Sequence, residues 1–440
     1  MTYSLWPHQA RSEPLLKGGS AILFHEMRTG KTRSALHAFN ELTKEGKVLD
    51  LVVVTVAMAK QTWKQEVELM RLGIPVHVAS GKKQLRLTPN LLETGEAKVP
   101  RIFIVNWEIL PQWQRWMQQQ TTKRGRAFVL VLDEGHLNLR NPTNQRYKAA
   151  YWLSKFAYAT WELTGTLLVK SGLDLYYQAR FLGRKDNPFA WMEEEDFGEE
   201  YCNRRFNPYK GKLGGWEYTD LRHPDEVMER LASVSVLRIK DIADVPPALQ
   251  MPRWVEDLGQ AWNYERSDET ISEEIRALIP IKARLTADYV QQLEARPIVV
   301  FGWHVEFTET VAELLEAPLI HGGVAVGARE RIRREFQEGQ HPVLVGNLRS
   351  LGLGISLDRA DHFVYGEPYW DASLYLQAQA RGVNLQKNRP ITHHHLLVAG
   401  SVEEYVWKVR LRRGEAIDEL YRAAEEREHP DVEPSRHIGG

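Results

Sequence analysis

Two short stretches of the chain carry residue types that together could bind and hydrolyse a nucleoside triphosphate. In the first, Asp133 and Glu134 directly follow the apolar run Phe128–Leu132. Such a run is typical of a buried parallel strand, and ligands bind at the carboxyl ends of these strands. Asp133 could hold Mg²⁺ there, and Glu134 could polarise a water molecule. Taken alone, the pair fits a solvated acidic turn equally well.

The second stretch is a loop that could cradle phosphate groups. It lies between an apolar segment, Ala21–Phe24, and a helix expected over Arg33–Lys44. In a strand–loop–helix unit, Gly30 lets backbone N–H groups approach an anion, and the helix N-terminus adds partial positive charge. Lys31 could then reach the β- and γ-phosphates, and the Thr32 hydroxyl could coordinate Mg²⁺.

This loop departs from the usual phosphate-binding pattern at its start, where His25 replaces the first glycine. Gly-Lys-Thr also occurs by chance in many chains. Because a second buried strand ends in the acidic pair, however, the two stretches together predict a nucleoside triphosphatase.

The composition limits the classes of protein that fit. The chain has 440 residues, enough for two or three domains, with a net charge of −1 and a pI near 7.0. This balance neither favours nor excludes nucleic acid, so any basic surface must be local. Cys202 is the single cysteine, which indicates a reducing compartment. With no signal-peptide pattern and no apolar run of membrane length, we expect a cytoplasmic protein without a membrane partner.

The elements that position these residues alternate between strands and helices in the first half of the chain. We expect strands at Ala21–Phe24, Leu49–Val54, Ile102–Val105, Phe128–Leu132 and Tyr158–Leu163, with helices at Gln61–Leu72 and Thr143–Phe156 among them. This alternation predicts a parallel sheet with helices on both faces. Beyond Phe181 the pattern breaks into an aromatic, acidic and glycine-rich insertion. Pro246-Pro247 and Pro252 then predict an extended crossing to a second lobe.

A second alternating series follows. The expected strands are Ile298–Phe301, Pro318–Ile320, Val343–Val345, Asp361–Tyr365 and His394–Val398, and the expected helices are Phe307–Leu315, Arg329–Glu338, Ser373–Gln379 and one starting near Val402. The sequence therefore predicts an α/β protein with two tandem lobes. Its predicted parts are lobe 1 (1–182), an insertion (183–240), lobe 2 (241–423) and a flexible tail (424–440). His393–His395 looks like a metal tract, but a strand turns alternate residues apart, so we expect no metal there.

Two lobes with one phosphate loop suggest a motor that binds ATP between them, so the second lobe must supply a group for the γ-phosphate. Arg381 is the best candidate, because an arginine on a helix facing the cleft can stabilise transition-state charge. A solvated helix arginine is the alternative interpretation. The turn Gly352-Leu353-Gly354 upstream, which could contact backbone or nucleotide, favours the first interpretation.

From Leu5 to about Lys408, the chain resembles the Swi/Snf-type ATPases of helicase superfamily two. The matching motifs, in family order, are Leu5–Gln9, Glu26–Thr32, Asp133–His136 with Arg140–Pro142, Leu163–Thr166, and Gln377 through Arg381. The resemblance implies two RecA-like parallel-sheet lobes with ATP and DNA in the cleft between them. It implies an ATP-dependent DNA translocase that uses ATP and Mg²⁺.

A closer resemblance is to the HARP-type annealing helicases. It is carried by Phe197–Cys202, Gly215–Tyr218, Leu237–Lys240, Glu367–Trp370 and Gly400–Trp407. It implies tracking on double-stranded or forked DNA, with remodelling or annealing rather than strand separation. The chain looks like a small stand-alone bacterial or phage version, expected as a monomer in the cytoplasm of a bacterial cell or a phage-infected host. The sequence identifies no protein partner.

The resemblance also implies roles for individual residues. The catalytic residues are Lys31, Asp133, Glu134 and Arg381, and Thr32 and Asp133 hold the metal. The nucleotide-binding residues are Gln9, Met27, Thr29, Gly30, Lys31, Thr32, Arg33 and Gly354. His136, Thr164, Thr166 and Gln377 are expected to couple ATP hydrolysis to DNA binding. Of these, His136 and Gln377 are expected to bond across the cleft. The expected DNA contacts are Lys60, Trp107, Arg140, His304, His321, Arg349 and Trp370.

Departures from the family pattern keep two other functions open. Val56, Leu167 and Lys170 replace residues of the family pattern. The motif Gln377 through Arg381 supplies the arginine finger for the γ-phosphate, and Asn384 stands where the family has a second finger arginine. One alternative is a single-strand DNA or RNA helicase, because the same two-lobe engine serves both. The other is an ATP-gated DNA clamp or recruitment module with weak turnover, which Asn384 favours because it carries no charge.

Overall fold

The computed structural model describes residues 4–81, 99–122, 126–207, 215–258, 268–351, 357–384 and 387–428. The chain divides into two compact units. Unit 1 comprises Met1–Lys210, Gly214–Ile242 and Ala416–Gly440, and unit 2 comprises Gly211–Leu213 and Ala243–Glu415. Each unit is an α/β fold around a parallel sheet, so the predicted class of two tandem α/β lobes is confirmed.

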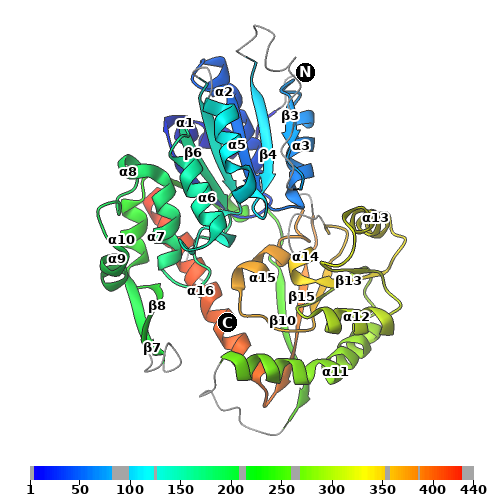
Figure 1. Cartoon of the computed structure of the whole chain (residues 1–440). Helices are drawn as coiled ribbons and strands as arrows, with labels where there is room; N and C mark the ends of the chain where they lie inside the picture. The colour runs from blue at the N-terminus through cyan, green and yellow to red at the C-terminus, as the bar shows by residue number, and fades with distance from the viewer. Residues whose placement is uncertain are drawn as a thin grey trace. The chain divides into compact units, whose positions relative to one another are not determined.

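Unit 1 is built on a seven-stranded sheet with the order β3-β4-β2-β5-β6-β1-β9. Figure 1 labels its strands β3, β4 and β6. Its strands are β1 (Ala21–His25), β2 (Asp50–Thr55), β3 (Val76–Val78), β4 (Arg101–Asn106), β5 (Phe128–Asp133), β6 (Ala159–Thr164) and β9 (Val234–Leu237). Every neighbouring pair is parallel. The carboxyl ends of β1, β5 and β6 therefore share one edge, where the phosphate loop, the acidic pair and the Thr-Gly-Thr motif follow them.

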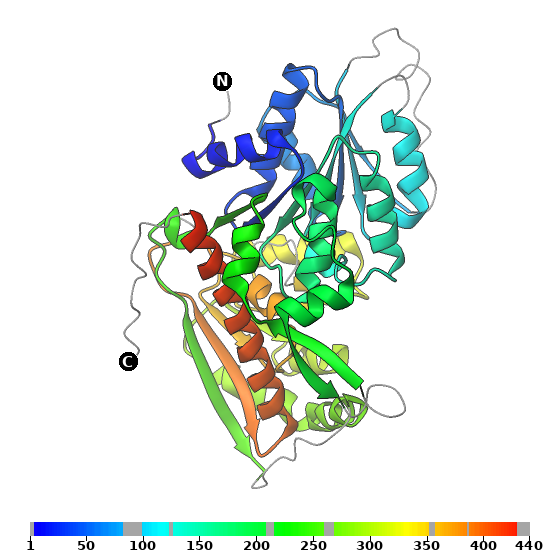
Figure 2. The ribbon, with the colours of Figure 1, turned by 90° about the vertical axis from the view of Figure 1, so that its left-hand side faces the viewer.

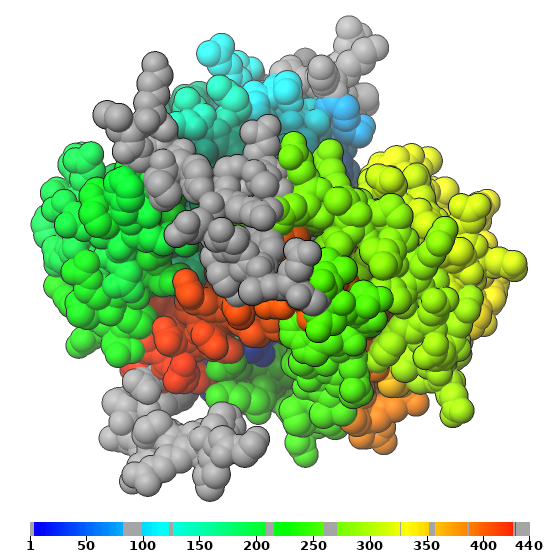
Figure 3. Space-filling view, turned by 90° about the horizontal axis from the view of Figure 1, so that it is seen from below, coloured from blue at the N-terminus to red at the C-terminus, as the bar shows by residue number. Residues whose placement is uncertain are grey.

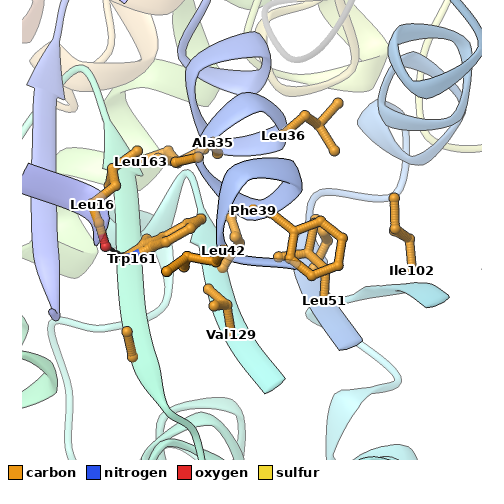
Figure 4. Close-up of a cluster of buried hydrophobic side chains, with 14 of the residues drawn as sticks. Leu16, Ala35, Leu36, Phe39, Leu42, Leu51, Ile102, Val129, Trp161 and Leu163 are labelled. Carbon is orange, nitrogen blue, oxygen red and sulfur yellow. Dashed lines mark hydrogen bonds between the residues drawn. The ribbon is translucent and has the colours of Figure 1, made fainter. Parts of the chain in front are cut away.

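The helices of unit 1 follow or connect the strands of this sheet. They are α1 (Pro7–Gly18), α2 (Lys31–Lys44), α3 (Ala59–Leu69), α5 (Leu110–Thr122), α6 (Gln145–Ser154), α7 (Leu173–Ala179), α8 (Gly183–Asp186), α9 (Glu194–Tyr201) and α10 (Pro224–Arg230). Phe39 and Leu42 of α2 belong to the same core cluster as Leu51 and Trp161 of the sheet (Figure 4). The Trp161 indole N–H donates to the Leu16 carbonyl at 3.0 Å and thereby fixes α1 beside β6.

The segment after Phe181 differs from the predicted insertion. Its last part, β9, pairs with β1 and extends the main sheet. The pairing joins parts of the chain that lie far apart in sequence, so no local pattern indicates it. The rest of the segment forms α8–α10 and a separate antiparallel hairpin of β7 (Cys202–Asn207) and β8 (Gly215–Leu221). The segment belongs to unit 1, apart from Gly211–Leu213.

The long helix α16 (Val402–Glu428) also differs from the predicted lobe 2 boundary and tail. Its residues from Ala416 onward belong to unit 1. There the Tyr421 ring stacks on Phe24 with 3.8 Å between centroids, and Arg427 donates to the carbonyl oxygen of Met228 at 3.0 Å. In Figure 2 this helix is the long red element, and in Figure 3 its red end lies against green residues of unit 1. These partners explain why the helix continues beyond residue 424.

Unit 2 contains a six-stranded sheet with the order β10-β15-β14-β11-β13-β12. Its strands are β10 (Leu249–Asp257), β11 (Ile298–Gly302), β12 (Leu319–Ile320), β13 (Val343–Asn347), β14 (His362–Tyr365) and β15 (Thr392–Ala399), and all neighbours are parallel. The segment around Pro252, predicted as a crossing between lobes, is thus an edge strand. An edge position tolerates proline because one side of the strand needs no ladder hydrogen bonds.

The helices of unit 2 are α11 (Asp268–Gln292), α12 (Val305–Leu314), α13 (Val326–Gln337), α14 (Leu348–Leu351), α15 (Ala372–Gln379) and the first part of α16. The sequence analysis missed α11. A buried ion pair ties this helix to α16. Lys282 Nζ pairs with the Glu403 carboxylate and donates to the Leu396 carbonyl at 2.9 Å. The Val398 N–H donates to the same Glu403 carboxylate at 2.8 Å.

The three histidines at the start of β15 are buried and neutral, because burial lowers the pKa of His393 to about 3 and that of His394 to about 4. His394 bonds with the Tyr289 hydroxyl at 2.8 Å, and His395 with the Gln250 amide oxygen at 2.8 Å. In the described part of the chain, no group of three or more His, Cys, Asp or Glu residues could hold a metal ion.

Candidate nucleotide and coupling site

The phosphate loop joins β1 to α2 in the way the sequence predicts. Gly30 adopts a left-handed backbone, with φ 81°, directly before the first residue of α2. A Cβ atom at this position would collide with the Gln9 side-chain amide, so only glycine allows both the turn and this contact. Gln9 is itself buried, and its amide oxygen accepts the Trp6 N–H at 3.0 Å. Gln9, which the resemblance assigns to nucleotide binding, therefore lies directly against the loop.

Three side chains fix the shape of the loop through its own backbone. Lys31 Nζ donates to the carbonyl oxygens of His25 and Glu26, at 2.8 and 3.1 Å. Thr29 Oγ1 also donates to the Glu26 carbonyl, at 2.8 Å, and His8 Nε2 bonds to the Thr29 carbonyl at 2.7 Å. The Lys31 ammonium group is therefore held at the start of the loop, close to where a bound phosphate would need its charge.

Asp133 ends β5 and is held from two other elements. Thr55 Oγ1 and Trp63 Nε1 both donate to its Oδ2, at 2.7 and 2.9 Å. Burial raises the pKa of Asp133, while these two hydrogen bonds and the charge of Lys31 oppose the rise. Both of these donors use Oδ2, and the Glu134 backbone N–H also interacts with the Asp133 carboxylate. A carboxylate and the half-buried Thr32 hydroxyl are oxygen donors of the kind that suits Mg²⁺.

Glu134 and His136 follow Asp133 in a tight turn. Glu134 has a left-handed backbone, with φ 51°, and its N–H donates to the Leu163 carbonyl at 2.8 Å. A non-glycine residue in this region is uncommon and marks a backbone held by its surroundings. His136 Nδ1 lies 2.8 Å from Thr164 Oγ1 and 3.6 Å from a Glu134 carboxylate oxygen. The acidic motif and the Thr-Gly-Thr motif are thus joined by side-chain contacts.

The proton positions at this junction follow from the hydrogen bonds. Thr164 Oγ1 donates its single proton to the Thr166 carbonyl at 2.6 Å and accepts the Thr166 N–H at 3.1 Å. It must therefore accept from His136, which carries its proton on Nδ1. Burial, then the charges of Arg140 and Lys31, lower the pKa of His136 to about 3. His136 is neutral at physiological pH, with an acceptor lone pair on Nε2.

Glu162 is a buried acid that sequence reasoning missed. It lies on β6 two residues before Thr164, and neither of its carboxyl oxygens has a hydrogen-bond partner among the described residues. Its carboxyl group lies where a side chain on Gly135 would be, under the Glu134 turn. Burial, with a smaller effect from the Glu134 charge, raises the pKa of Glu162 well above its ordinary value. Its buried position therefore favours the protonated form of the carboxyl group.

The remaining predicted nucleotide residues occupy varied environments. Met27 is buried and packs against the position where a side chain on Gly165 would lie. Arg33 points to α3, where its Nε pairs with Glu66 at 2.5 Å. Gly354 lies outside the described residues.

The predicted DNA contacts of unit 1 require one correction. Trp107 is fully buried, and its indole N–H donates to the Asp133 carbonyl at 3.0 Å. DNA cannot reach a fully buried side chain. The hydrogen bond to Asp133 instead gives Trp107 a role in positioning the acidic motif. Lys60 is half-buried, and its Nζ donates to the Ala79 carbonyl and to Asn106 Oδ1, both at 3.0 Å. Arg140 is also partly exposed.

The predicted contacts of unit 2 follow the strands of its sheet. His304 comes after β11, and its ring Nδ1 lies 2.8 Å from the Glu367 carboxylate, which also accepts the backbone N–H groups of Trp303 and His304. The exposed Arg349 lies after β13, with its guanidinium group 4.7 Å from the centre of the Trp303 ring.

His321 and Trp370 follow two further strands of this sheet, β12 and β14. His321 is partly exposed. Trp370 packs into a small cluster with Tyr405 of α16, so this tryptophan also has a structural role.

The predicted finger region lies at the end of α15. The backbone carbonyl of Arg381 accepts the Leu357 N–H at 3.0 Å, and Gln377 is fully buried within the helix. Asn384 donates its side-chain amide to the Asp358 carboxylate at 3.1 Å. Gln377 and Arg381 belong to unit 2 and His136 to unit 1. The proposed bond between His136 and Gln377 stays a prediction.

Trp63, Thr55, Glu367 and Glu162 are the residues of these sites that sequence reasoning did not find. Trp63 and Thr55 both bond to Asp133, which lies 70 and 78 positions from them along the chain, so no local pattern links them to it. Two signals were available: Glu162 is a charged residue in the middle of an expected buried strand, and Glu367 begins the motif Glu367–Trp370.

Comparison with known proteins identifies two domains. A family model described as an SNF2-related domain matches residues 13–211, and one described as a helicase conserved C-terminal domain matches residues 281–385. With the parallel sheets and the phosphate loop, these matches define a helicase-type protein of two α/β domains. The chain thus contains an SNF2-related domain and a helicase C-terminal domain, which agrees with the resemblance drawn from its motifs.

Three curated relatives illustrate the similarity. The SWI/SNF-related matrix-associated actin-dependent regulator of chromatin subfamily A-like protein 1 of Drosophila melanogaster is 22% identical over 431 residues, which cover 91% of this chain and 54% of that protein. The protein of the same name from Bos taurus is 24% identical, with coverages of 88% and 42%. An uncharacterized ATP-dependent helicase of Mycoplasma genitalium is 20% identical, with coverages of 90% and 40%. The chain thus spans about half of these relatives' length.

Among solved structures, the chain is similar to the Sulfolobus solfataricus SWI2/SNF2 ATPase core in complex with dsDNA, with a TM-score of 0.44 and 16% identity. The match covers 97% of this chain and 95% of that one. None of the described helices is long and apolar enough to cross a membrane.

Proposed function

We propose that the chain is an ATP-dependent translocase that tracks on duplex DNA and remodels or anneals DNA structures. The observation that carries this proposal is the convergence of three motifs at one edge of the unit 1 sheet. The Lys31 charge acts on Asp133, and His136 bonds to Thr164. A hydrolytic centre that is hydrogen-bonded to a neighbouring motif fits an enzyme that couples ATP hydrolysis to movement on a polymer. The helicase names of its relatives favour DNA as the polymer.

The chemistry divides among the residues as follows. Lys31 and the loop N–H groups bind the phosphates, and Gln9 binds the base. Mg²⁺, held by Thr32 and Asp133, would neutralise phosphate charge. Glu134 orients the attacking water, and Arg381 supplies positive charge to the γ-phosphoryl group.

Movement would come from phosphate contacts that change with ATP state. The proposed contact residues are Lys60, Arg140, His304, His321, Arg349 and Trp370, with Trp107 withdrawn because it is buried. Contacts of this kind bind with strong salt dependence and little sequence preference. We propose that the chain acts as a monomer on double-stranded or forked DNA.

The test is steady-state ATP hydrolysis with duplex DNA, single-stranded DNA, RNA or no polymer. We expect the greatest stimulation by duplex DNA, with Lys31→Ala inactive and still folded. Glu134→Gln should bind ATP and DNA and hydrolyse poorly, because it loses only water activation. Greater stimulation by RNA or single strands would favour the alternative helicase. Unchanged turnover of Lys31→Ala would reject the loop assignment.

An ATP-gated clamp is the second candidate, because Asn384 is bonded to Asp358 and brings no charge to the finger region. It predicts ATP-dependent DNA binding with turnover that DNA barely accelerates. The same assay, combined with DNA-binding measurements with and without ATP, separates it from the translocase.

A further inference from the structure

The β7–β8 hairpin has two chemically different faces. Strand alternation and the cross-strand register place four side chains on one face, and we call this set the aromatic face: Arg204, Phe206, Trp216 and Tyr218. The opposite face is polar and locally neutralised, since Arg205 and Asn207 both bond to Glu217. Figure 1 shows the hairpin projecting from the helices of unit 1.

The aromatic face exposes large rings to solvent. Trp216 is 57% exposed and Phe206 is 48% exposed, and the two rings meet edge to face with 5.6 Å between centroids. The Arg204 guanidinium lies 5.1 Å from the centre of the Trp216 ring, and its exposed side chain also lies 3.9 Å from the exposed Glu199 carboxylate. A group of large aromatic rings exposed on one surface is typical of a binding site.

The base of the hairpin is anchored in the fold. The Tyr218 ring packs against Gly198 of α9, where any side chain would collide with it. The Gly172 N–H donates to the Thr219 carbonyl at 2.7 Å, and Cys202 packs against the Gly172 Cα. The hairpin is therefore held by a surface that needs glycine at two positions.

The anchoring segment leads directly back to the coupling site. The Asp174 carboxylate accepts N–H groups from Val169, Lys170 and Ser171, and the Gln178 amide donates to the Leu167 carbonyl at 2.8 Å. These bonds make residues 167–172 a stiff connection between Thr166 and the hairpin.

We propose that the aromatic face of the β7–β8 hairpin binds the unpaired bases of a single-stranded DNA segment next to the duplex. This proposal rests on the proposed DNA function and specifies its substrate class. Single strands are bound by aromatic side chains on which bases stack, together with cations that meet the backbone phosphates. A duplex hides its base faces, so it cannot use Trp216 and Phe206 in this way.

Binding to two synthetic DNAs tests the proposal: a blunt duplex, and the same duplex with a single-stranded oligothymidine arm. We expect Trp216→Ala to weaken binding of the armed duplex by about tenfold, the scale of one lost stacking contact. Phe206→Ala should act in the same direction, and Trp216→Phe should retain most of the affinity. Binding to the blunt duplex, and the ATP hydrolysis it stimulates, should stay within about twofold of the wild type.

Trp191→Ala is the matched control, because Trp191 is 70% exposed in unit 1 and lies outside the hairpin. Circular dichroism and thermal melting confirm that each variant is folded. Equal losses on both DNAs, or none on the armed duplex, would overturn the proposal. A change in self-association, measured by light scattering, would instead assign the aromatic face to a second copy of the chain. Since the binding assay needs no ATP, its result is independent of whether the chain hydrolyses ATP.

Discussion

His136 Nδ1 lies 2.8 Å from Thr164 Oγ1, and this contact joins the acidic motif after β5 to the Thr-Gly-Thr motif after β6. The Thr164 hydroxyl also holds both the N–H and the carbonyl of Thr166. One side chain therefore sets the tautomer of His136 and the shape of the neighbouring loop. We interpret the contact between His136 and Thr164 as the link between the state of the bound nucleotide and DNA binding.

Thr164→Val should weaken this link, because it keeps the shape of the side chain and removes its hydrogen bonds. We expect ATP affinity near the wild-type value, with DNA stimulation of turnover reduced by an amount equivalent to about 0.5–2 kcal/mol of coupling. The measurement compares turnover at saturating ATP with and without duplex DNA. Thr160→Val, another buried threonine on β6, is the control. If both variants behaved alike, the hydroxyl of Thr164 would have no special role.

Trp63→Phe should impair the metal site, because Asp133 Oδ2 loses a 2.9 Å donor. Removing a residue that orients a metal ligand typically costs about 10–100-fold in metal affinity or activity. We expect a higher Mg²⁺ concentration for half-maximal ATP hydrolysis. Trp113→Phe removes an indole bond to the Gly81 carbonyl and serves as the control. A Mg²⁺ requirement that Trp63→Phe leaves unchanged would contradict this role.

Glu162→Gln should make stability less sensitive to high pH. The native pKa of Glu162 is raised, so between its unfolded and folded pKa values the native state binds a proton that the unfolded state lacks. Stability is then lost as pH rises, by up to about 1.4 kcal/mol per pH unit from this one group. Glutamine removes that dependence.

Thermal denaturation over pH 5–8 measures this effect. The stability of Glu162→Gln relative to the wild type should grow with pH and be smallest at the acidic end. A constant difference across the range would show that Glu162 does not change its protonation on unfolding.

Glu403→Leu should strongly destabilise unit 2, because it leaves the buried ammonium group of Lys282 without its carboxylate. Breaking a buried ion pair costs about 3–5 kcal/mol, whereas replacing both partners by apolar residues is often neutral. We therefore expect Lys282→Met combined with Glu403→Leu to recover much of the loss. Urea denaturation of the single and double variants provides the comparison. Additive losses would show that the two charges do not depend on each other.

Arg381→Ala should nearly abolish turnover, because a finger arginine contributes about 10³–10⁵ in rate and Asn384 has no charge to replace it. Asn384→Arg should leave the rate close to wild type, because its guanidinium group would meet the Asp358 carboxylate that Asn384 now contacts. Single-turnover ATP hydrolysis measures both. Retention of more than about a tenth of the activity in Arg381→Ala would move the finger to another residue, with Arg349 or Arg389 next to test.

The sequence by itself determined the features that depend on neighbouring residues. The apolar runs predicted β1 and β5, and the residues after them predicted the phosphate loop and the acidic pair, because strand burial and turn chemistry are local. The alternation of such runs also predicted two parallel-sheet lobes. These predictions needed only short windows of sequence.

Only the tertiary structure decided which distant residues support that site. Thr55 reaches Asp133 because β2 and β5 are neighbouring parallel strands with their carboxyl ends at one edge, and Trp63 reaches it from helix α3. The same packing buries Trp107, which the sequence suggested for DNA, and closes Glu162 away from water. Burial and hydrogen bonding are sums over neighbours in space, and a sequence window contains only neighbours along the chain.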